Sequence, residues 1–392
     1  MTGLPEKLPV HVALLTGYIP PYQAEVYRAL AACVERLTVL VSTEMESDRA
    51  WQADWDGIEV VVQRGFSLRK TWRGRAGGKG RAFRETGERH FPTDTIRRLR
   101  SIKPDIVVSE ELGARSMLAG GYAKTARCPL ILAVNMSVHT EQGRGKIQTR
   151  LRRWLLSRAA AVTANSESGK QYLRTLGVKE EKVFSFPYAA DASEFLEVAC
   201  PRQVPINRWL YCGALSERKA VVGFLQELAD WLIEHPEMSV ELTLAGEGRE
   251  QQQLESFSLP SNLRIRIVSH RTYSQLAELY GQHAVLVLPT LADEWGMVVN
   301  ESLAAATPVL GSVYSEAVAE LIVEDETGWR FCPDQREELR AAFARCLSTS
   351  PTKLSQMQAA ARRSIDARTP AWAANHLSEA IRYVFENTSR HG

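Results

Sequence analysis

Long hydrophobic runs are missing from this chain of 392 residues. Its longest apolar stretches, such as Ala284–Leu291, fall far short of the roughly 18 residues that a membrane-spanning helix needs. The first residues, MTGLPEKLPV, show no basic segment followed by an apolar one, so no secretory signal is expected. These absences argue against an integral membrane protein and predict a cytoplasmic one.

Cysteine is sparse, and its six positions show no Cys-x-x-Cys spacing. Closely spaced cysteine pairs are typical of structural zinc sites, and dense cysteine is typical of small disulfide-bonded secreted domains. The sequence argues against both and fits a reduced compartment. The positions are Cys33, Cys128, Cys200, Cys212, Cys332 and Cys346.

A dinucleotide-binding fingerprint is lacking as well. An enzyme that binds a nicotinamide or flavin dinucleotide should carry Gly-x-Gly-x-x-Gly between its first strand and first helix. Here that turn reads TGYIPPY, with one glycine and two prolines, and Gly246-Glu247-Gly248 supplies only part of the fingerprint in mid-domain. A dehydrogenase is therefore disfavoured.

Charge is abundant but unevenly distributed behind a net charge of +2. Residues 1–200 carry 30 Lys and Arg against 22 Asp and Glu, a net charge of +8, whereas residues 201–392 carry 18 against 24, a net charge of −6. The centre of the densest basic stretch, RKTWRGRAGGKGRAFR, holds four glycines and predicts a mobile loop. A solvated charged face, or contact with anionic lipid headgroups or a phosphate-bearing acceptor, would each account for it.

Short apolar, β-rich runs alternate with helical patterns from end to end. This alternation is typical of parallel sheets that are covered by helices on both faces. The pattern restarts near Arg208, after the proline-bearing segment CPRQVPIN. We therefore expect an α/β protein with two doubly wound, Rossmann-like domains, 1–200 and 201–370. An amphipathic helix within 371–392 is expected to cross back onto the first domain.

One candidate ligand loop in the second half is 213–219, because ligands of such domains bind where parallel strands end and helices begin. Gly213 lets the backbone approach a ligand, and Arg218 and Lys219 stand where the next helix starts. Cations beside helix amides suit a diphosphate. A surface loop with two solvated cations is the simpler alternative.

A second candidate loop is DEWGMVVNE, from Asp293 to Glu301. Eight positions separate these two carboxylates, about two helical turns, which would place both on one helix face. Either could accept hydrogen bonds from a ribose diol or sugar hydroxyls. A helix-dipole role explains Asp293 and Glu294 without a ligand, but explains the apolar-flanked Glu301 poorly. A third loop, 311–320, has small residues that expose amides at a strand end.

These motifs lie in a longer segment, VLVLPTLADEWGMVVNESLAAATPVLGSVYSEAVAELIVEDETGW. It resembles the retaining glycosyltransferases of family 4, in which a strand ending in Leu-Pro-Ser precedes E-G-F-G-x-x-x-x-E-A-x-A-x-G-x-P-V. The turn YCGALSERK resembles the family's G-R-L-x-x-x-K-G, and PDIVVSE, RLRRWLLSRAAAVTANSESGKQYL and PYAAD resemble segments of its first domain. The resemblance covers nearly the whole chain and implies the GT-B fold, two Rossmann-like domains facing across a cleft.

The resemblance also implies roles for individual residues. Glu301 matches the glutamate expected to hold the ribose, Asp293 the acidic residue near the transferred sugar, and Lys219 the diphosphate-binding lysine. As catalytic residues we therefore predict Asp293, His139 and Lys219. As donor-binding residues we predict Gly17, Gly213, Arg218, Lys219, His270, Arg271, Glu294, Trp295, Gly296, Met297, Val298 and Glu301.

Several of these assignments rest on position. Gly17 matches a glycine loop that closes over the donor, His139 follows a strand end of the first domain, and His270 and Arg271 follow a strand where the family places the nucleobase. The co-substrate would be a nucleoside-diphosphate sugar, with no metal and no other cofactor required. The acceptor would be a hydroxyl, lipid-linked or phosphate-bearing, in glycan, polysaccharide or glycoconjugate biosynthesis.

Two departures from the family pattern keep other functions open. Asp293 is one methylene shorter than the family's glutamate, and Ala214 stands where the family has an arginine, although Arg218 is near enough to substitute. A nucleotide-sugar epimerase and a catalytically inactive sugar-nucleotide-binding protein therefore remain alternatives. A nucleic-acid binder is disfavoured, because no recognised nucleic-acid-binding motif accompanies the basic stretch.

The segment Gln148–Arg158 interleaves four arginines with apolar residues. Such a helix ordinarily packs its apolar face on the sheet. It could instead lie on a membrane surface and present a lipid-linked acceptor. Peripheral contact with the inner face of the membrane is therefore an alternative to a purely cytoplasmic location.

Overall fold

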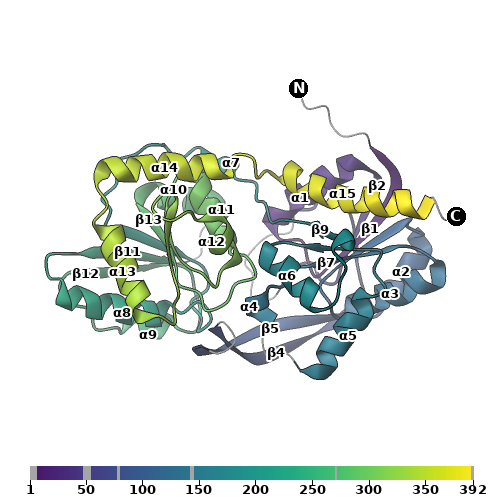
Figure 1. The fold of residues 1–392 in the computed structure, drawn as a ribbon, viewed down its shortest axis with the longest axis horizontal. Helices are drawn as coiled ribbons and strands as arrows, with labels where there is room; N and C mark the ends of the chain where they lie inside the picture. Colours follow the sequence, from purple (N-terminus) through teal and green to yellow (C-terminus); the bar gives the residue numbers. More distant parts are fainter. Residues whose placement is uncertain (1–6, 47–53, 77–79, 142–144, 270–271, 390–392) are drawn as a thin grey trace. The chain divides into compact units, whose positions relative to one another are not determined.

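The computed structural model describes residues 7–46, 54–76, 80–141, 145–269 and 272–389. The chain divides into two compact units (Figure 1). Unit 1 comprises Met1–Lys70, Thr86–Asp191 and Arg368–Gly392, and unit 2 comprises Thr71–Glu85 and Ala192–Ala367. Each unit holds its own parallel sheet, which confirms the predicted α/β class with two Rossmann-like halves.

Unit 1 is built on a seven-stranded sheet of order β3-β2-β1-β6-β7-β8-β9, in which each pair of neighbours is parallel. The strands are β1 (Leu8–Thr16), β2 (Val34–Val41), β3 (Glu59–Val62), β6 (Ile106–Glu110), β7 (Leu130–Val134), β8 (Ala161–Ala164) and β9 (Val183–Ser185). The helices are α1 (Pro21–Cys33), α2 (Thr95–Ile102), α3 (Ala114–Ala126), α4 (Val138–Glu141), α5 (Lys146–Leu156), α6 (Glu167–Thr175) and α15 (Pro370–Ser389).

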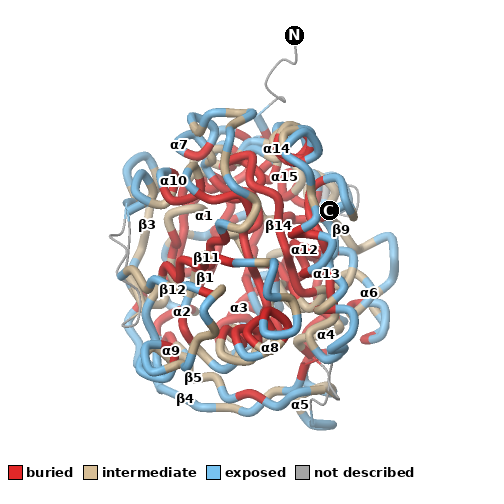
Figure 2. Tube along the Cα trace, turned by 90° about the vertical axis from the view of Figure 1, so that its left-hand side faces the viewer, coloured by how far each residue is buried: buried red, intermediate tan, exposed pale blue. Residues whose placement is uncertain are grey.

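Alternation along β1 shows how this sheet is buried on both faces. Val12 and Leu14 pack into a core with side chains of α1 and α15, while Ala13 and Leu15 pack into a second core with side chains of α2, α3, α5 and α6. Successive side chains of a strand point to opposite faces, so both sets must be apolar when helices cover both faces. Figure 2 accordingly shows β1 as buried.

Unit 2 repeats this design with a six-stranded parallel sheet of order β12-β11-β10-β13-β14-β15. The strands are β10 (Arg208–Cys212), β11 (Val240–Ala245), β12 (Leu263–Val268), β13 (Val285–Leu288), β14 (Val309–Ser312) and β15 (Gly328–Phe331). The helices are α7 (Ser193–Leu196), α8 (Val221–Glu234), α9 (Gln251–Glu255), α10 (Tyr273–Gln282), α11 (Met297–Ala304), α12 (Glu316–Leu321), α13 (Arg336–Leu347) and α14 (Pro351–Ile365).

Local sequence signals fix several helix ends. Ser166 was predicted to begin a helix, and its side chain accepts a hydrogen bond from the amide of Gly169 at 2.9 Å, which satisfies one of the amides left over at the start of α6. Gly177 was predicted to stop that helix, and it adopts a left-handed conformation with φ of 87° just beyond it. Both predictions are confirmed.

The carboxyl-terminal helix α15 lies in unit 1, alongside α1 (Figure 1). Ala373, Ala374 and Leu377 of α15 are fully buried in the core that they share with β1 and α1. The chain thus returns from unit 2 to unit 1 after Ala367. The sequence placed the first domain at 1–200, whereas unit 2 already begins at Ala192 and also takes Thr71–Glu85 from within that range.

The basic stretch predicted as a mobile loop is instead a two-stranded hairpin, formed by β4 (Gly65–Arg75) and β5 (Ala82–Pro92). Most side chains of β4 are exposed, which is why its charge resembles that of a loop (Figure 2). Near the tip, however, Ala76 and Phe83 are buried against residues of unit 2. A few apolar side chains in a very basic segment therefore decide the structure, and charge content alone does not reveal them.

Candidate active site

The candidate donor loops follow β10, β13 and β14, which are neighbours in the sheet of unit 2. Parallel strands end at the same edge of a sheet, so loops that follow adjacent strands lie side by side. Loop 213–219 and the segment 291–293 are in direct contact, since the amide of Leu291 donates to the carbonyl of Arg218 at 2.8 Å. The amide of Asp293 donates to the carbonyl of Tyr314, in the loop after β14, at 2.9 Å.

Lys219 and Asp293 form an ion pair at this edge of the sheet, through Nζ and Oδ2. Arg218 adds its Nη1 at 3.6 Å from Oδ1 of the same carboxylate. Burial opposes ionisation of Asp293, but the two cations outweigh it and hold the pKa of that carboxyl below its usual range. The structure therefore brings together three predicted residues as a charged group rather than as separate solvated side chains.

Arg218 also donates hydrogen bonds to two other protein groups. Its Nε donates to Oε2 of Glu85 at 2.6 Å, and its Nη1 donates to the carbonyl of Ala292 at 2.8 Å. Sequence reasoning missed Glu85, which lies on β5 and belongs to unit 2. No local pattern marks this residue, because 133 positions separate it from Arg218.

Gly296 gives the acidic loop its shape. Its φ of 109° lies in the region that side chains disfavour, and a Cβ there would stand 2.8 Å from Oγ of Ser315. α11 begins directly after it at Met297, and amides at the start of a helix lack a carbonyl partner one turn earlier, so they can serve an anion. Met297 and Val298, predicted to offer amides, occupy this first turn.

Glu301 lies on the second turn of α11 and is only 7% exposed. It accepts a hydrogen bond from the hydroxyl of Tyr280 at 3.3 Å, and burial raises the pKa of its carboxyl to about 7. A buried carboxylate with one protein donor has acceptor capacity left for hydroxyl groups. The prediction that Asp293 and Glu301 share a helix face is wrong, because Asp293 precedes the turn at Gly296 and lies outside α11.

The remaining predicted donor residues differ in exposure. Trp295 is buried, and its ring N–H donates to Oδ1 of Asn300 at 2.7 Å, so its side chain holds the loop together. Glu294 is exposed. Gly213 has a φ of 143°, and its amide donates to the carbonyl of Ala245 at 3.0 Å. His270 and Arg271 lie outside the described residues.

Gly17 and His139 belong to unit 1, where each follows the carboxyl end of a strand. The carbonyl of Gly17 accepts hydrogen bonds from the amides of Ser42 and Thr43 at 2.9 and 3.0 Å, which ties the end of β1 to the end of β2. His139 lies on α4, after β7, and burial lowers the pKa of its imidazole, which favours the neutral ring. Their roles stay predictions.

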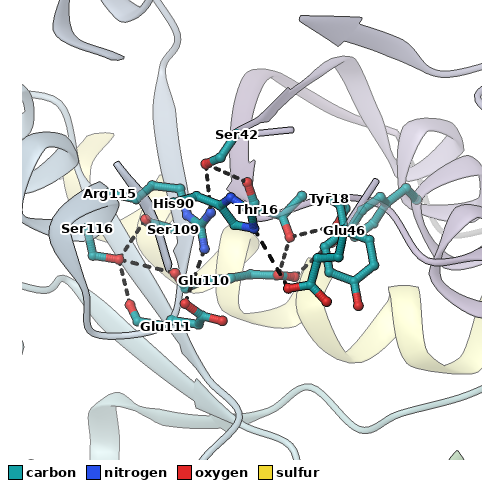
Figure 3. Close-up of polar contacts among 11 residues, drawn as sticks. Thr16, Tyr18, Ser42, Glu46, His90, Ser109, Glu110, Glu111, Arg115 and Ser116 are labelled. Carbon is teal, nitrogen blue, oxygen red and sulfur yellow. Dashed lines mark hydrogen bonds and ion pairs between the residues drawn. The ribbon is translucent and has the colours of Figure 1, made fainter. Parts of the chain in front are cut away.

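A buried polar cluster at the same edge of unit 1 was not predicted (Figure 3). Glu110 ends β6 and accepts hydrogen bonds from the hydroxyls of Thr16 and Tyr27 at 2.6 and 2.7 Å, while burial raises the pKa of its carboxyl. Arg115, on the first turn of α3, is 6% exposed and donates to Oγ of Ser42 at 3.0 Å. The only sequence signal for this polar cluster was the carboxylate at the end of the strand PDIVVSE.

The described residues contain no group of three His, Cys, Asp or Glu side chains that could hold a metal ion. An Asp-Trp-Asp sequence occurs at 54–56 in unit 1, where Asp54 forms an ion pair with Arg28 at 2.9 Å. Within the described ranges, no helix is long and apolar enough to cross a membrane.

Comparisons with known proteins agree with this architecture. A family model described as "Glycosyl transferases group 1" matches residues 206–349, and one described as "Glycosyl transferase 4-like domain" matches residues 19–189. Glycogen synthase of Mycobacterium tuberculosis is 26% identical over 278 residues, which are 67% of this chain and 65% of the relative. The chain thus spans slightly less than two thirds of that relative's length.

Solved structures show the same fold at low sequence identity. HepE of Anabaena, in complex with UDP and glucose, superposes with a TM-score of 0.69 at 15% identity, over 95% of this chain and 99% of HepE. WaaG, a glycosyltransferase involved in lipopolysaccharide biosynthesis, gives a TM-score of 0.63 at 15% identity, over 94% and 99% of the two chains. With one glycosyltransferase model matching each half and two parallel-sheet units of this kind, the chain belongs to the GT-B glycosyltransferases.

Proposed function

We propose that this protein transfers a sugar from a nucleoside-diphosphate sugar to a hydroxyl acceptor, with retention of configuration and without a metal ion. The observation that carries the proposal is the charged group of Lys219, Asp293 and Arg218 beside buried Glu301, all at one edge of the sheet in unit 2. The relative HepE binds UDP and glucose, which supports a nucleotide sugar as donor.

The proposed chemistry follows from charge. A diphosphate leaving group gains negative charge as the sugar–oxygen bond breaks, so donors aimed at the phosphates stabilise the transition state. Lys219, Arg218 and the first amides of α11 would supply them. Glu301 would accept hydrogen bonds from the ribose hydroxyls, and Asp293 would orient Lys219 and lie near the transferred sugar. The acceptor hydroxyl would pass its proton to the leaving phosphate, so the protein need not supply a nucleophile.

A thermal-shift screen tests the donor site. UDP, GDP, ADP, dTDP and CMP are added without metal to the wild type and to Glu301→Ala. A ligand that binds only the folded state raises the melting temperature. At 100 times its dissociation constant it adds about 2.7 kcal/mol to the apparent free energy of unfolding. We expect one diphosphate to stabilise the wild type and to lose its effect in Glu301→Ala.

The rival functions give different results. An inactive binding protein would show the same shift but no sugar transfer, and an epimerase would convert the donor without any acceptor. If none of the nucleotides shifts the wild type or a variant with an intact donor loop, the proposed donor site is wrong. Salt-sensitive binding to DNA or RNA would then favour the nucleic-acid alternative.

We further propose that unit 1 contacts an anionic membrane surface through α5 and presents a lipid-linked or phosphate-bearing acceptor. Ile147, Leu151 and Trp154 lie at helical spacing on this helix and are 78%, 50% and 42% exposed. Residues 146–158 contain five cations and no acidic residue. Exposed apolar side chains among cations suit an anionic bilayer. The predicted packing on the sheet holds for Leu155 and Leu156, which are buried.

Vesicle sedimentation tests the membrane contact. The wild type should sediment with phosphatidylglycerol-containing vesicles and remain in solution with phosphatidylcholine alone. The triple variant Ile147→Ser/Leu151→Ser/Trp154→Ser should lose this binding while melting at nearly the same temperature, because the three side chains are exposed. Equal sedimentation of the variant, or no sedimentation of the wild type, would contradict the proposal.

A further inference from the structure

The tip of the β4–β5 hairpin, Thr71–Glu85, is a structural part of unit 2 even though the bases of both strands belong to unit 1. Its apolar contact is made by Ala76 and Phe83, which are 0% and 6% exposed. They pack against Ala220, at the start of α8, and against Leu291 and Ala292, just before the acidic donor loop. The tip therefore sits on the same segments that hold Arg218 and Asp293.

Polar contacts also hold the tip in one position on unit 2. The amide of Arg81 donates to Oδ1 of Asp334 at 3.0 Å, and the amide of Arg84 donates to Oε2 of Glu217 at 2.8 Å. A Cβ on Gly223 would stand 1.9 Å from Nη1 of Arg81, so this guanidinium lies directly on the backbone of α8. These contacts are specific, and they bring the next residue of β5, Glu85, to Arg218.

Glu85 and Arg218 form a close ion pair, at 2.6 Å between Oε2 and Nε. Their side chains are 19% and 26% exposed, so solvent screens the pair less than it would a surface pair. Lys219 is paired with Asp293 in the same way. The two cations proposed for the diphosphate are thus neutralised by two carboxylates, and one of these comes from the hairpin.

The paired carboxylates reduce the positive charge that is available to the diphosphate of a donor. A diphosphate needs uncompensated positive charge and guanidinium N–H groups to bind well. Asp293 is a part of the donor loop, but Glu85 reaches Arg218 only because the hairpin tip is docked. A phosphate that approaches Arg218 would meet the Glu85 carboxylate on the same guanidinium, and the two like charges would repel each other.

We propose that the Glu85 carboxylate pairs with the Arg218 guanidinium in the absence of a donor and that the diphosphate displaces it. The hairpin tip then competes with the donor for Arg218. This inference rests on the proposed function, because it assigns the diphosphate to Arg218. Glu85 sets the affinity for the donor without contacting it in the bound state. We call the docked hairpin tip, residues 71–85, the strap: while Glu85 is paired with Arg218, unit 2 has a low affinity for the donor.

The first test compares nucleotide affinity in the wild type, Glu85→Gln and Glu88→Gln by isothermal titration with UDP, GDP, ADP and dTDP. Glutamine keeps the shape of glutamate but removes the charge that competes with phosphate. We expect Glu85→Gln to bind the preferred diphosphate about tenfold more tightly, since a hydrogen bond to a charged group is worth about that much. Glu88→Gln removes the same charge three positions along β5 and should match the wild type.

The second test follows the hairpin itself by limited digestion with trypsin, for which Arg73, Arg75, Arg81 and Arg84 offer sites. Saturating diphosphate should speed cleavage within residues 71–85 in the wild type, because the pair with Arg218 is broken. Glu85→Gln should be cleaved faster even without ligand. Unchanged cleavage in both cases would overturn the displacement.

The outcomes separate the two proposals. Tighter binding by Glu85→Gln supports the strap, including the case in which only this variant binds a nucleotide. Wild-type binding that is equal to or stronger than that of Glu85→Gln overturns the strap but leaves the donor site standing. Failure of every nucleotide to bind wild type and Glu85→Gln alike overturns both.

Discussion

Lys219→Ala is expected to lower the rate of sugar transfer by roughly 10²–10³, the usual cost of removing one donor that stabilises a developing negative charge. Lys219 pairs with Asp293, a residue of the donor loop itself. Arg218 is tied to Glu85 and to the carbonyl of Ala292, so it can replace Lys219 only in part. The measurement is donor turnover, by transfer or by hydrolysis, alongside the affinity for the diphosphate.

The same variant leaves Asp293 buried without its main cation, which costs stability as well as activity. The double variant Lys219→Ala/Asp293→Asn removes both charges and should regain most of the lost melting temperature without regaining turnover. Lys170→Ala serves as control, since Lys170 lies on α6 in unit 1 and pairs with Glu167. Turnover within a few-fold of the wild type in the double variant would contradict the proposed role of Lys219.

Arg202→Ala is expected to lower the free energy of unfolding of unit 2 by about 3 kcal/mol, at the upper end of the range for hydrogen bonds to a charged group, because this half-buried guanidinium serves several acceptors. Arg202 donates to the carbonyls of Tyr280, His283, Ala305 and Ala306 and to Oγ1 of Thr307, at 2.6 to 3.1 Å. Burial lowers the pKa of its guanidinium to about 10, so it is still charged at neutral pH. Without it, several buried carbonyls each lose a donor at once.

Calorimetry measures this loss, because two units can unfold in separate transitions and a single midpoint would blur them. Only the transition of unit 2 should shift. Arg264→Ala is the matched control: its side chain is 81% exposed and its ion pair with Glu241 spans 3.8 Å, so it should change stability by less than about 0.5 kcal/mol. A loss below about 1 kcal/mol for Arg202→Ala would show that the carbonyls find other donors.

The local motifs of unit 2 could be predicted because each depends on neighbours in sequence. Gly296 needs a left-handed turn, α11 starts after it, and Lys219 stands before α8 within one strand–loop–helix unit. Such units bring their ligand residues to one edge of the sheet by topology alone. The parallel order of strands followed from the alternation of apolar runs for the same reason.

Contacts between distant segments could not be predicted in this way. Glu85 meets Arg218 across 133 positions, and the cluster of Thr16, Glu110 and Arg115 joins three segments of unit 1. The hairpin sequence shows neither the helical nor the strand periodicity of apolar residues, because few of its side chains are buried. Its structure depends on what Ala76 and Phe83 pack against.

The sequence by itself determined the class of fold, the two parallel sheets and the candidate loops that follow β10, β13 and β14. Hydrophobic periodicity and turn chemistry act over a few residues, and a single chain displays them directly. Only the tertiary structure decided which charges are paired: Lys219 with Asp293, Arg218 with Glu85, and Arg202 with the carbonyls around α11. The reason is physical, since Coulomb energy and hydrogen bonding depend on distance and burial, and folding alone sets both.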